Sequence, residues 1–587
     1  MNSPPDNSDR RHILSVVLED YCHVGPVSRV VPRSYWHRFE SRVERNTERT
    51  LDLLDEMGCK ATFFILGWIA EHQPDVVAEV ARRGHEVASK GFWHRSIRAM
   101  TPEEFREDVS RSKRAIEAAA GVEVRGFRIP RGGFGERDLW ALKVLLSEGY
   151  AYDSSLRPLG SAFSDEPFRR FIHRHEINGD AIWEVPLSTW KLGPLCLPIS
   201  GGNFVRQLPH AFVRRALDEW EREHNDPIVF YFHIWELDPE QPRITAVSQL
   251  QSIRQYRNLK AMTERIRYYL KKYRFGTVAD YLELGPAPVV DVQPVTPLPL
   301  SSVPASGLIP AVREHDGPLV PITVVVPCYN EEATLGYLSN TLNSFSDGMK
   351  NSYQTTFLFV DDGSSDGTWA RLNALFGNRP DCALLRHAQN RGVAATVLSG
   401  IRHAKTDIVC VIDCDGTYDP LQLQKMIPML QPGIDLVTAS PYHPDGRVLN
   451  LPPWRLILSK GLSVIYRFVH RHKLATYTSC FRVYRRQAVD KIVLRDERFV
   501  GVTELLSRID AGGGGVVECP AIMEVRLLGT SKMKTLKTIK GHLGHLTRLI
   551  GARLIGERIF KPSLPTPARL GGMLSGPGAG KEAHKGG

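Results

Sequence analysis

Cysteine patterns that would bind structural zinc or form a disulfide framework are missing from this sequence of 587 residues. The nine cysteines are an odd number, they are scattered along the chain, and no two are separated by only two residues. Disulfide-stapled domains and zinc-binding folds usually show such regular spacings. We therefore expect neither feature, and we expect a reducing compartment.

Long apolar runs are also missing. No stretch of about 18 apolar residues could cross a membrane, and the apolar run before Glu19 and Asp20 is too short for the core of a signal peptide. We therefore expect a cytoplasmic chain. The formal net charge of +10 suits nucleic acid, an anionic membrane surface or phosphorylated substrates. Because no arginine- and aromatic-rich motif occurs, we predict no nucleic-acid partner.

Proline divides the chain into two parts. Residues 285–320 are dense in proline and show no periodicity, which predicts an extended linker. This linker separates a domain at 12–284 from a second domain at 321–560. The glycine-rich tail at 561–587 is predicted to be disordered.

Strand and helix patterns alternate in the first domain. Strand-like segments at 12–19, 60–67 and 85–89 are separated by amphipathic helical segments. The helix that follows Thr101 carries a capping signal, because Glu104 stands three residues later. Such repeated strand–helix units predict an α/β domain with a parallel sheet that can close into a barrel.

The second domain repeats this alternation. Strand-like segments at 321–330, 354–364 and 407–415 alternate with helical ones. The pattern predicts an open, doubly wound α/β domain. In such domains ligands bind at the carboxyl ends of the strands.

Acidic residues gather at these strand ends. Asp361 and Asp362 end one strand, and Asp413 and Asp415 end another. Two converging carboxylates can hold a hard cation such as Mg²⁺ or Mn²⁺, which would bridge a diphosphate. A lone Asp-x-Asp sequence is more often a solvated turn, so this pattern alone leaves both interpretations open.

Three further motifs accompany the acidic pairs. "VVVPCYNEE", "VDDGSSDGT" and "NRGVAATVLSGI" occur in that order, and together they resemble family 2 glycosyltransferases over about residues 320–535. The similarity is greatest to the branch that transfers a sugar to a polyprenyl phosphate. It implies a GT-A-type nucleotide-sugar-binding domain, a UDP- or GDP-sugar donor, a lipid-phosphate or glycan acceptor, and Mg²⁺ or Mn²⁺ as cofactor.

The resemblance also implies roles for individual residues. The nucleotide pocket would be lined by Pro327, Tyr329, Asn330 and Glu331, and Arg391 and Gly392 would help to shape it. Asp362 would hold the base or ribose with support from Asp361, and Asp413 and Asp415 would bind the metal and diphosphate. In "EVRLLGTSKMK", donor or acceptor phosphate would be clamped by Arg526, Ser531 and Lys532.

Two features near the expected acceptor side are open to more than one interpretation. Glu504 would be the general base that deprotonates the acceptor, but it could equally be a helix carboxylate paired with Arg508. In "TYTSCFRVYRR", Thr476 and Cys480 stand where the family has an acidic residue and a glycine, which puts the acceptor in doubt.

The basic, apolar segment at 534–561 also allows two interpretations. It fits a packing helix. It also fits an interfacial helix that makes a peripheral membrane contact, which would bring the enzyme to a lipid-linked acceptor.

The first domain contains the motifs "VVLEDY", "SKGFWH", "GFRIPRGG", "YDSS" and "VFYFHIWELDP" in this order. Over about residues 12–285 they resemble the polysaccharide deacetylase (NodB-homology) family, in the branch associated with exosortase loci. The resemblance implies metal-assisted amide hydrolysis with Zn²⁺ or another divalent metal. Glu19 would be the base, and Asp20 and His94 would be metal ligands. The remaining roles would fall to Arg128 (orienting the base), Asp153 (tuning the acid), His233 (the acid), and Tyr231 and Trp235 (lining the sugar groove).

Lys90 stands where this family has its first histidine ligand. An ammonium has no lone pair, and deprotonation is opposed by the neighbouring carboxylates. Our hypothesis is that the Lys90 ammonium takes the place of the metal and pairs with Asp20. The alternative keeps a metal on Asp20, His94 and water.

Taken together, the sequence predicts a fusion of an active glycosyltransferase with a deacetylase-like domain, acting in cell-surface polysaccharide synthesis. We expect it in the cytoplasm, with peripheral contact to the inner face of the membrane. In one alternative the deacetylase is the working enzyme and the transferase domain is accessory. In another, the first half is a non-catalytic glycan-binding module.

Overall fold

The computed structural model describes residues 10–131, 134–158, 166–193, 195–293, 318–449, 453–524, 526–529 and 535–554. The chain forms two compact units, the first mainly before Ser302 and the second mainly from Val303 onward. The predicted tail, and all but the two ends of the predicted linker, lie outside the described residues.

The first unit is built on a mainly parallel sheet. Its strands follow the order β10-β1-β2-β3-β4-β5-β7-β6, with β11 also paired to β1 and only β6 antiparallel to its neighbour. The strands are β1 (Arg11–Leu18), β2 (Thr62–Ile65), β3 (Glu86–Ser89), β4 (Gly126–Phe127), β5 (Tyr152–Asp153), β6 (His173–Ile177), β7 (Asp180–Glu184), β10 (Val229–His233) and β11 (Arg274–Gly276). This α/β arrangement is barrel-like, but within the described residues no strand pairing joins β10 to β6.

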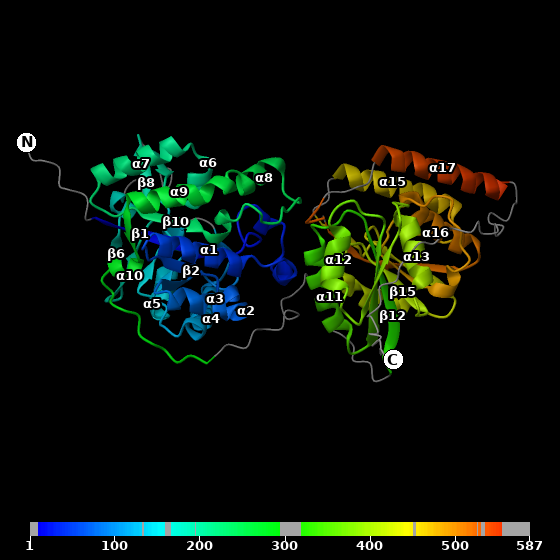
Figure 1. Ribbon diagram of the computed structural model, residues 1–587, viewed down its shortest axis with the longest axis horizontal. Coiled ribbons are helices and arrows are strands. Elements are labelled where there is room, and N and C mark those ends of the chain that lie inside the picture. The colour runs from blue at the N-terminus through cyan, green and yellow to red at the C-terminus, as the bar shows by residue number, and fades with distance from the viewer. Residues whose placement is uncertain are drawn as a thin grey trace, which may run out of the picture. The chain divides into compact units, whose positions relative to one another are not determined.

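Helices cover this sheet, and β8 (Thr189–Leu192) and β9 (Leu195–Pro198) form a separate pair. In Figure 1, α7 and α9 lie on one side of β1 and β10, and α3, α4 and α5 lie on the other. The helices are α1 (Val43–Glu56), α2 (Gly67–His72), α3 (Pro74–Arg82), α4 (Pro102–Ala120), α5 (Trp140–Ser147), α6 (Gly202–Gln207), α7 (His210–Glu223), α8 (Gln249–Tyr256), α9 (Leu259–Lys272) and α10 (Val278–Tyr281).

The second unit contains a seven-stranded mixed sheet in the order β14-β13-β12-β15-β18-β16-β19. All neighbouring strands are parallel except that β18 runs antiparallel to β15 and β16. The strands are β12 (Val320–Cys328), β13 (Tyr353–Asp361), β14 (Cys382–Arg386), β15 (Ile408–Val411), β16 (Ile434–Ser440), β18 (Arg482–Arg485) and β19 (Gly515–Pro520); β17 (Arg447–Val448) and β20 (Ile522–Met523) pair separately.

Apolar residues on both faces of β12 explain why its sequence is an unbroken apolar run. Val324 and Val326 pack in one buried cluster together with Leu338 of α11 (Leu335–Met349), whereas Val325 packs in the opposite cluster together with Val397 of α13 (Val393–His403). A strand that is buried on both faces needs no polar alternation. The sheet therefore has helices on both faces, as the doubly wound prediction required.

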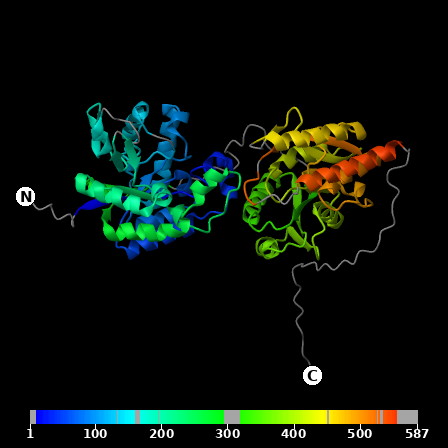
Figure 2. The ribbon, with the colours of Figure 1, turned by 90° about the horizontal axis from the view of Figure 1, so that it is seen from above.

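Figure 1 shows α11 and α12 on one side of β12 and β15, and α13 and α16 on the other. Figure 2 shows α15 and α17 beside each other along one edge of this unit. The helices are α11 (Leu335–Met349), α12 (Thr368–Phe376), α13 (Val393–His403), α14 (Leu423–Met426), α15 (Pro453–Val469), α16 (Phe499–Ala511) and α17 (Thr535–Leu554). None of the helices in the described ranges is long and apolar enough to span a bilayer.

The capping signal at the start of α4 is confirmed. The Thr101 hydroxyl oxygen accepts a hydrogen bond from the Glu104 backbone N–H at 3.2 Å, and the Glu104 carboxylate accepts one from the Thr101 N–H at 2.9 Å. Gly121 ends the helix with φ of +69°, a conformation that favours glycine.

We predict that Thr101→Ala destabilises the first turn of α4 by about 1 kcal/mol, because the Glu104 amide loses its acceptor. Hydrogen exchange of the amides at the start of α4 measures this loss as faster exchange. Thr101→Ser keeps the hydroxyl and should exchange almost as the natural protein does. Equal exchange in the alanine and serine variants would contradict the capping assignment.

Candidate functional site

A cavity of about 830 Å³ lies in the second unit, at the carboxyl ends of β12, β13 and β15. Its wall includes eight of the residues that the sequence pointed to: Pro327, Tyr329, Glu331, Asp362, Gly392, Asp413, Asp415 and Arg526. These residues come from five separate stretches of sequence. The parallel strands bring them together because their carboxyl ends meet at one edge of the sheet.

The acidic pair that follows β15 carries more negative charge than its surroundings balance. Burial and the charge of Asp415 raise the pKa of Asp413 to about 7. Asp415 accepts hydrogen bonds from the Thr417 amide at 3.0 Å and the Thr417 hydroxyl at 2.8 Å. Its second oxygen lies 3.2 Å from Nε of Arg526. A cation placed here would keep both carboxylates ionised.

Arg526 links this acidic pair to the end of β12. Its Nη2 lies 2.5 Å from Oε1 of Glu331, while its Nε contacts Asp415. The pKa of Glu331 is raised by burial, which the charge of Arg526 partly offsets. One guanidinium therefore serves two carboxylates, and it lies on the wall of the cavity where a diphosphate could reach it.

The donor set in this cavity fits a hard divalent cation. Carboxylate oxygens are the ligands that Mg²⁺ and Mn²⁺ prefer, and Mg²⁺ usually keeps water and substrate phosphate among its ligands. Asp413 and Asp415 supply two such carboxylates. Across the described ranges no three His, Cys, Asp or Glu side chains form a complete metal cage. A metal here would therefore depend on ligands from a bound nucleotide.

Asp362 lines the cavity, but its oxygens are already engaged. They accept hydrogen bonds from His387 Nδ1 at 2.7 Å, Asn390 Nδ2 at 3.0 Å, and the backbone amides of Arg391 and Gly392 at 3.0 and 2.7 Å. A carboxylate has about four acceptor positions, and these bonds use all of them. Asp362 therefore holds the loop at 387–392 in place, and the predicted contact with base or ribose would require giving up one of these bonds.

Gly392 in this loop requires glycine for two reasons. Its φ is +115°, and a Cβ there would lie 2.5 Å from the Glu497 carbonyl oxygen. The neighbouring Arg391 side chain turns to Glu497, with Nη2 2.6 Å from Oε1, and does not line the cavity. Asp361 is fully buried, lies 2.9 Å from Arg386, and is likewise not part of the cavity wall.

Glu504 does not line the cavity, where a general base would meet the acceptor. It is 2% exposed and lies outside the cavity wall. Its carboxylate accepts hydrogen bonds from the backbone amides of Arg495 and Asp496 at 3.0–3.1 Å and lies 2.6 Å from Nη2 of Arg508. These contacts agree with the alternative, a structural carboxylate paired with Arg508, and the role of general base stays a prediction. The carboxylate holds the segment before α16.

The cavity wall also contains residues that the sequence motifs did not single out. They are Cys328, Asn390, Val393, Thr396, Cys414, Asp496, Arg498, Phe499, Val500, Lys537, Thr538, Lys540 and Gly541. Asn390, Val393 and Thr396 stand inside the quoted motif "NRGVAATVLSGI", which was a usable signal. The residues from 496 onward come from the start of α16 and from α17, where no motif marks them. Ser531 and Lys532 lie outside the described residues.

The two departures from the family pattern have distinct surroundings. Thr476 is buried and accepts a hydrogen bond from the Ser440 hydroxyl at 3.0 Å. The Cys480 thiol is buried, and burial together with the charge of Asp413 raises its pKa well above the ordinary value. A side chain at position 480 therefore lies near the acidic pair.

In the first unit, Glu19, His94 and His233 meet at the carboxyl ends of the strands. The Glu19 carboxylate, 1% exposed, lies 3.1 Å from His94 Nε2 and 2.8 Å from His233 Nδ1. Both of its oxygens and His233 Nδ1 are buried without a hydrogen bond of ordinary geometry. Burial would raise the pKa of Glu19, but the positive charges of Lys90 and His94 outweigh it and hold the pKa well below the ordinary value.

The expected pairing of Lys90 with Asp20 is wrong. The Asp20 oxygens accept hydrogen bonds from the backbone amides of Tyr21 and Arg42, both at 2.8 Å, and burial raises the pKa of Asp20 to about 6. Lys90 Nζ instead donates to the Ile129 carbonyl oxygen at 3.4 Å. Burial lowers the pKa of Lys90 to about 8, so the ammonium still dominates at neutral pH, where its charge acts on Glu19.

The roles predicted for Arg128 and Asp153 stay predictions, and the structure gives both side chains other partners. Arg128 donates to the Ser15 hydroxyl at 2.9 Å and to the Ser154 hydroxyl and carbonyl oxygens at 2.8 and 3.1 Å, and none of these bonds goes to Glu19. Asp153 accepts from the Ser155 hydroxyl at 2.6 Å, and His233 pairs with Glu19 instead of Asp153.

Tyr231 and Trp235 were expected to line a sugar groove. Both are buried, at 8% and 4% exposure. The Trp235 ring lies 5.8 Å from the His233 ring, and the Tyr231 ring lies 5.4 Å from the Arg128 guanidinium. Tyr231 lies in β10 and Trp235 in the short helical turn that follows it, and little of either ring is left for a ligand.

These residues do not fit a divalent metal in the first unit. Only Asp20 and His94 remain of the predicted ligands, and the two oxygens of Asp20 already accept backbone hydrogen bonds. A fixed ammonium stands in the same cluster and would repel a divalent cation. In the part of the chain that the structure describes, no group of three metal-binding side chains occurs.

Comparisons with known protein families give different matches for the first and the second part of the chain. The family described as Glycosyl transferase family 2 matches residues 323–493. Polysaccharide deacetylase matches residues 30–150, and a domain of unknown function (DUF3473) matches residues 154–283.

One curated relative and two solved structures illustrate the matches. Polyprenol monophosphomannose synthase of Mycolicibacterium smegmatis is 32% identical over 218 residues, 36% of this chain and 80% of that protein. Glucosyl-3-phosphoglycerate synthase of Mycobacterium tuberculosis, solved with Mn²⁺, UDP-glucose and phosphoglyceric acid, is 21% identical over 41% of this chain and 80% of its own, with a TM-score of 0.30. A CE4 family pseudoenzyme of Bacillus anthracis is 14% identical over 49% of this chain and 68% of its own, with a TM-score of 0.25.

The buried acids Asp153 and Glu184 predict a pH dependence of stability. They oppose each other on β5 and β7. Burial raises the pKa of Asp153 to about 6, and burial and the charge of Asp153 raise that of Glu184 well above its ordinary value. The unfolded chain releases these protons near pH 4 and the folded chain only near pH 6 or above. Because the folded chain holds these protons more tightly, their binding adds to the free energy of unfolding. This contribution is complete below about pH 4 and is lost as the pH rises through about 6.

We expect the natural protein to lose up to about 3 kcal/mol of unfolding free energy between pH 4 and pH 7 relative to Asp153→Asn. Urea denaturation of the first unit across this range measures the difference. Asp180→Asn, at an exposed position on β7, is the matched control and should give a curve parallel to that of the natural protein. If the free energy of unfolding of Asp153→Asn also changed with pH in parallel with that of the natural protein, the raised pKa of Asp153 would be contradicted.

Proposed function

We propose, from the premise that this chain belongs to glycosyl transferase family 2 and carries a polysaccharide deacetylase domain ahead of it, that it transfers a sugar from a UDP- or GDP-sugar to a lipid phosphate or a glycan. The observation that supports this most strongly is the cavity in which Asp413, Asp415, Glu331 and Arg526 share one wall. Such a wall suits a nucleoside diphosphate bound through a divalent cation.

The residues of the cavity have separable tasks in this proposal. Asp413 and Asp415 would hold Mg²⁺ or Mn²⁺, and when bound the ion would neutralise charge on the departing diphosphate. Arg526, already between Asp415 and Glu331, would turn to the phosphate oxygens. Pro327 and Tyr329 would form the wall beside the nucleotide, and Asp362 would keep the 387–392 loop in the shape that the donor needs.

A phosphate acceptor agrees with the burial of Glu504 outside the cavity wall. In the transfer, an acceptor oxygen forms a bond to the anomeric carbon while the bond from that carbon to the diphosphate breaks, and its electron pair leaves with the nucleoside diphosphate. A phosphate monoester, with a second pKa near 6, is already ionised at neutral pH and has no proton to give up. A sugar hydroxyl would need a general base. We therefore favour a polyprenyl phosphate, since polyprenol is the lipid in the name of the Mycolicibacterium relative.

Apolar side chains exposed on α15 and α17 support a peripheral contact with the inner face of the cell membrane. They are Val464, Ile465, Phe468, Leu543 and Ile550. Leu546 and Leu549 of the same helix, α17, pack in the buried cluster of the second unit. The helix therefore serves as a packing helix, and the interfacial role adds to it.

The transferase proposal predicts that Asp415→Asn lowers sugar transfer at least about hundredfold, because the metal loses a charged ligand. The measurement is a screen of UDP- and GDP-sugars against polyprenyl phosphate with the intact chain, with Mn²⁺ or Mg²⁺ added and then removed by chelation. Asp435→Asn, at a carboxylate outside the cavity wall, is the control and should keep full activity. Transfer that survives both chelation and Asp415→Asn would refute the proposal.

For the first unit we propose a deacetylase fold whose site carries Lys90 in place of a metal ligand and has little or no metal affinity. Lys90 is 2% exposed and its charge acts on Glu19, in the same cluster as His94 and His233. A module of this kind would bind the glycan that the second unit handles. The competing proposal keeps an active deacetylase, and a setting in exosortase-linked polysaccharide synthesis stays a prediction of the sequence.

Calorimetric titration of Zn²⁺ into the intact chain distinguishes these proposals. We expect weak or no binding by the natural chain, and binding at least about tenfold tighter by Lys90→His, which removes the charge and adds a ligand. Lys90→Met removes the charge without adding a ligand and is the matched control. Tight binding that is the same in all three proteins, together with acetate release from N-acetylated oligosaccharides, would overturn the metal-free site.

A further inference from the structure

Three cations on the cavity wall of the second unit have no carboxylate partner within the described residues. They are Arg498, Lys537 and Lys540. The fourth cation of the wall, Arg526, is in contact with Glu331 and Asp415. The wall is therefore divided between an acidic part, where Arg526 offsets some of the negative charge, and a basic part whose cations have no carboxylate partner.

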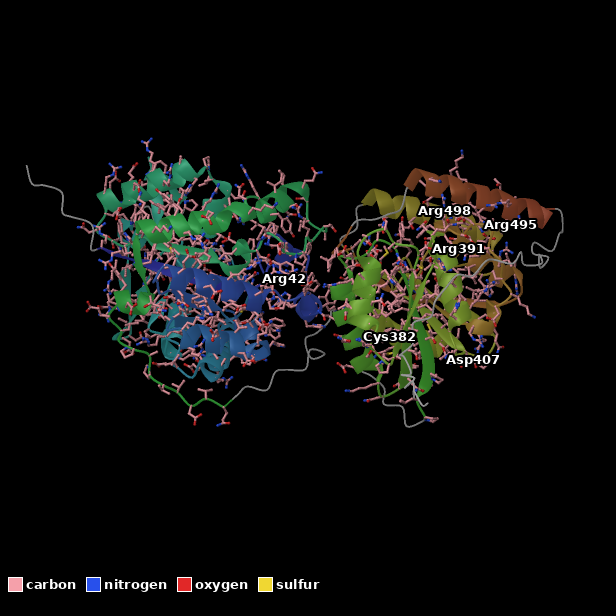
Figure 3. All side chains as sticks on the ribbon, in the orientation of Figure 1. Arg42, Cys382, Arg391, Asp407, Arg495 and Arg498 are labelled. Atoms are coloured by element: carbon pink, nitrogen blue, oxygen red, sulfur yellow. The ribbon has the colours of Figure 1, made fainter. Side chains whose placement is uncertain are left out.

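The basic part is built from two helices that approach closely. Arg498 directly precedes α16, and Lys537 and Lys540 stand three residues apart in the first turns of α17, which places them on the same side of that helix. A Cβ added to Gly541 of α17 would lie 2.8 Å from Val500 of α16, so glycine lets the helices meet here. Figure 3 shows Arg498 beside α17.

Hydrogen bonds to Glu504 and Asp496 hold the segment that carries Arg498 in place. Glu504 accepts hydrogen bonds from the backbone amides of Arg495 and Asp496. Asp496 is the one carboxylate of this part of the wall, and its Oδ1 accepts the backbone N–H of Arg498 at 2.8 Å. Three positive charges therefore face one engaged negative charge, which leaves a net attraction for an anion.

We propose that Arg498, Lys537 and Lys540 form a second anion subsite that binds the phosphate of a lipid-phosphate acceptor. The inference rests on the proposed sugar transfer and adds the residues that select the acceptor. The diphosphate of the donor is served by Asp413, Asp415 and their cation, so it does not need these three charges. A neutral glycan hydroxyl would gain little from them, whereas a phosphate monoester carries a charge of about −2.

The continuation of α17 supports a lipid as the carrier of this phosphate. Leu543 and Ile550 follow Lys540 at spacings of three and ten residues, which keeps them on neighbouring positions of one helix stripe. Both are exposed, at 52% and 43%. A phosphate held at Lys540 would therefore have an apolar surface beside it for the first units of an isoprenoid chain.

The test measures KM separately for the two substrates with the intact chain. Lys537→Gln, Lys540→Gln and Arg498→Gln should each raise KM for a fifteen-carbon isoprenyl phosphate about tenfold, and KM for the nucleotide sugar should stay within about twofold. Lys405→Gln removes an exposed lysine outside the cavity wall and should change neither constant. A rise in the KM for the nucleotide sugar alone would assign these cations to the donor diphosphate. If the KM values for both substrates stayed unchanged, the proposed subsite would be refuted.

A binding measurement keeps this inference separate from the proposed activity. Equilibrium binding of the fifteen-carbon isoprenyl phosphate is compared with that of the corresponding alcohol and of inorganic phosphate. If no donor supports transfer, the proposed function fails, but binding of the lipid phosphate that is lost in the triple variant still supports the subsite. The proposed subsite would be overturned if the isoprenyl phosphate and the isoprenyl alcohol bound equally. It would also be overturned if the triple variant, with glutamine at positions 498, 537 and 540, bound the isoprenyl phosphate as the natural chain does.

Discussion

The contacts of Arg526 with Asp415 and Glu331 are the interaction on which the site in the second unit depends. They join the end of β15 to the residues after β12 through a side chain that follows β20, at 3.2 and 2.5 Å. Without this guanidinium, three carboxylates would face each other across a half-buried wall, and the pKa of Asp413, already raised to about 7 by burial and by Asp415, would rise further. The same negative charge is what attracts a divalent cation and, through it, a diphosphate.

The polar cluster of the first unit balances its charge in a different way. There the cation is part of the chain, because Lys90 stands where a metal ligand would be expected, and it acts on Glu19 instead of Asp20. The two units therefore differ in how the charge of these carboxylates is balanced. One site has a deficit of positive charge that a ligand can fill, and the other already contains its positive charge. This difference is why we assign the chemistry of sugar transfer to the second unit.

Much of the fold could be predicted from the sequence because local patterns determine it. The apolar run of β12, the cap at Thr101 and the acidic ends of β13 and β15 are all short-range signals, and each occurs where the sequence indicated. The partners of individual side chains could not be predicted in the same way. Asp362 is engaged by residues 25–30 positions later, and Glu504 by amides 8–9 positions earlier, so a motif identifies the carboxylate but not what already occupies it.

The residues of α17 were missed for a related physical reason. Lys537 and Lys540 belong to a segment whose composition suits either a packing helix or a membrane-surface helix, and only the close approach at Gly541 brings them to the cavity. The pairing of Lys90 with Asp20 failed because backbone amides of Tyr21 and Arg42 reach Asp20 first. Such competition between backbone and side-chain donors is decided in three dimensions.

The most direct test of a metal-dependent diphosphate site in the second unit is electron paramagnetic resonance of Mn²⁺ added to the intact chain, with and without UDP or GDP. The account predicts that the signal of free Mn²⁺ falls only when a nucleoside diphosphate is present, and that Asp413→Asn restores the free signal. A free-ion signal that is unaffected by nucleotide, or bound Mn²⁺ that survives Asp413→Asn unchanged, would contradict it.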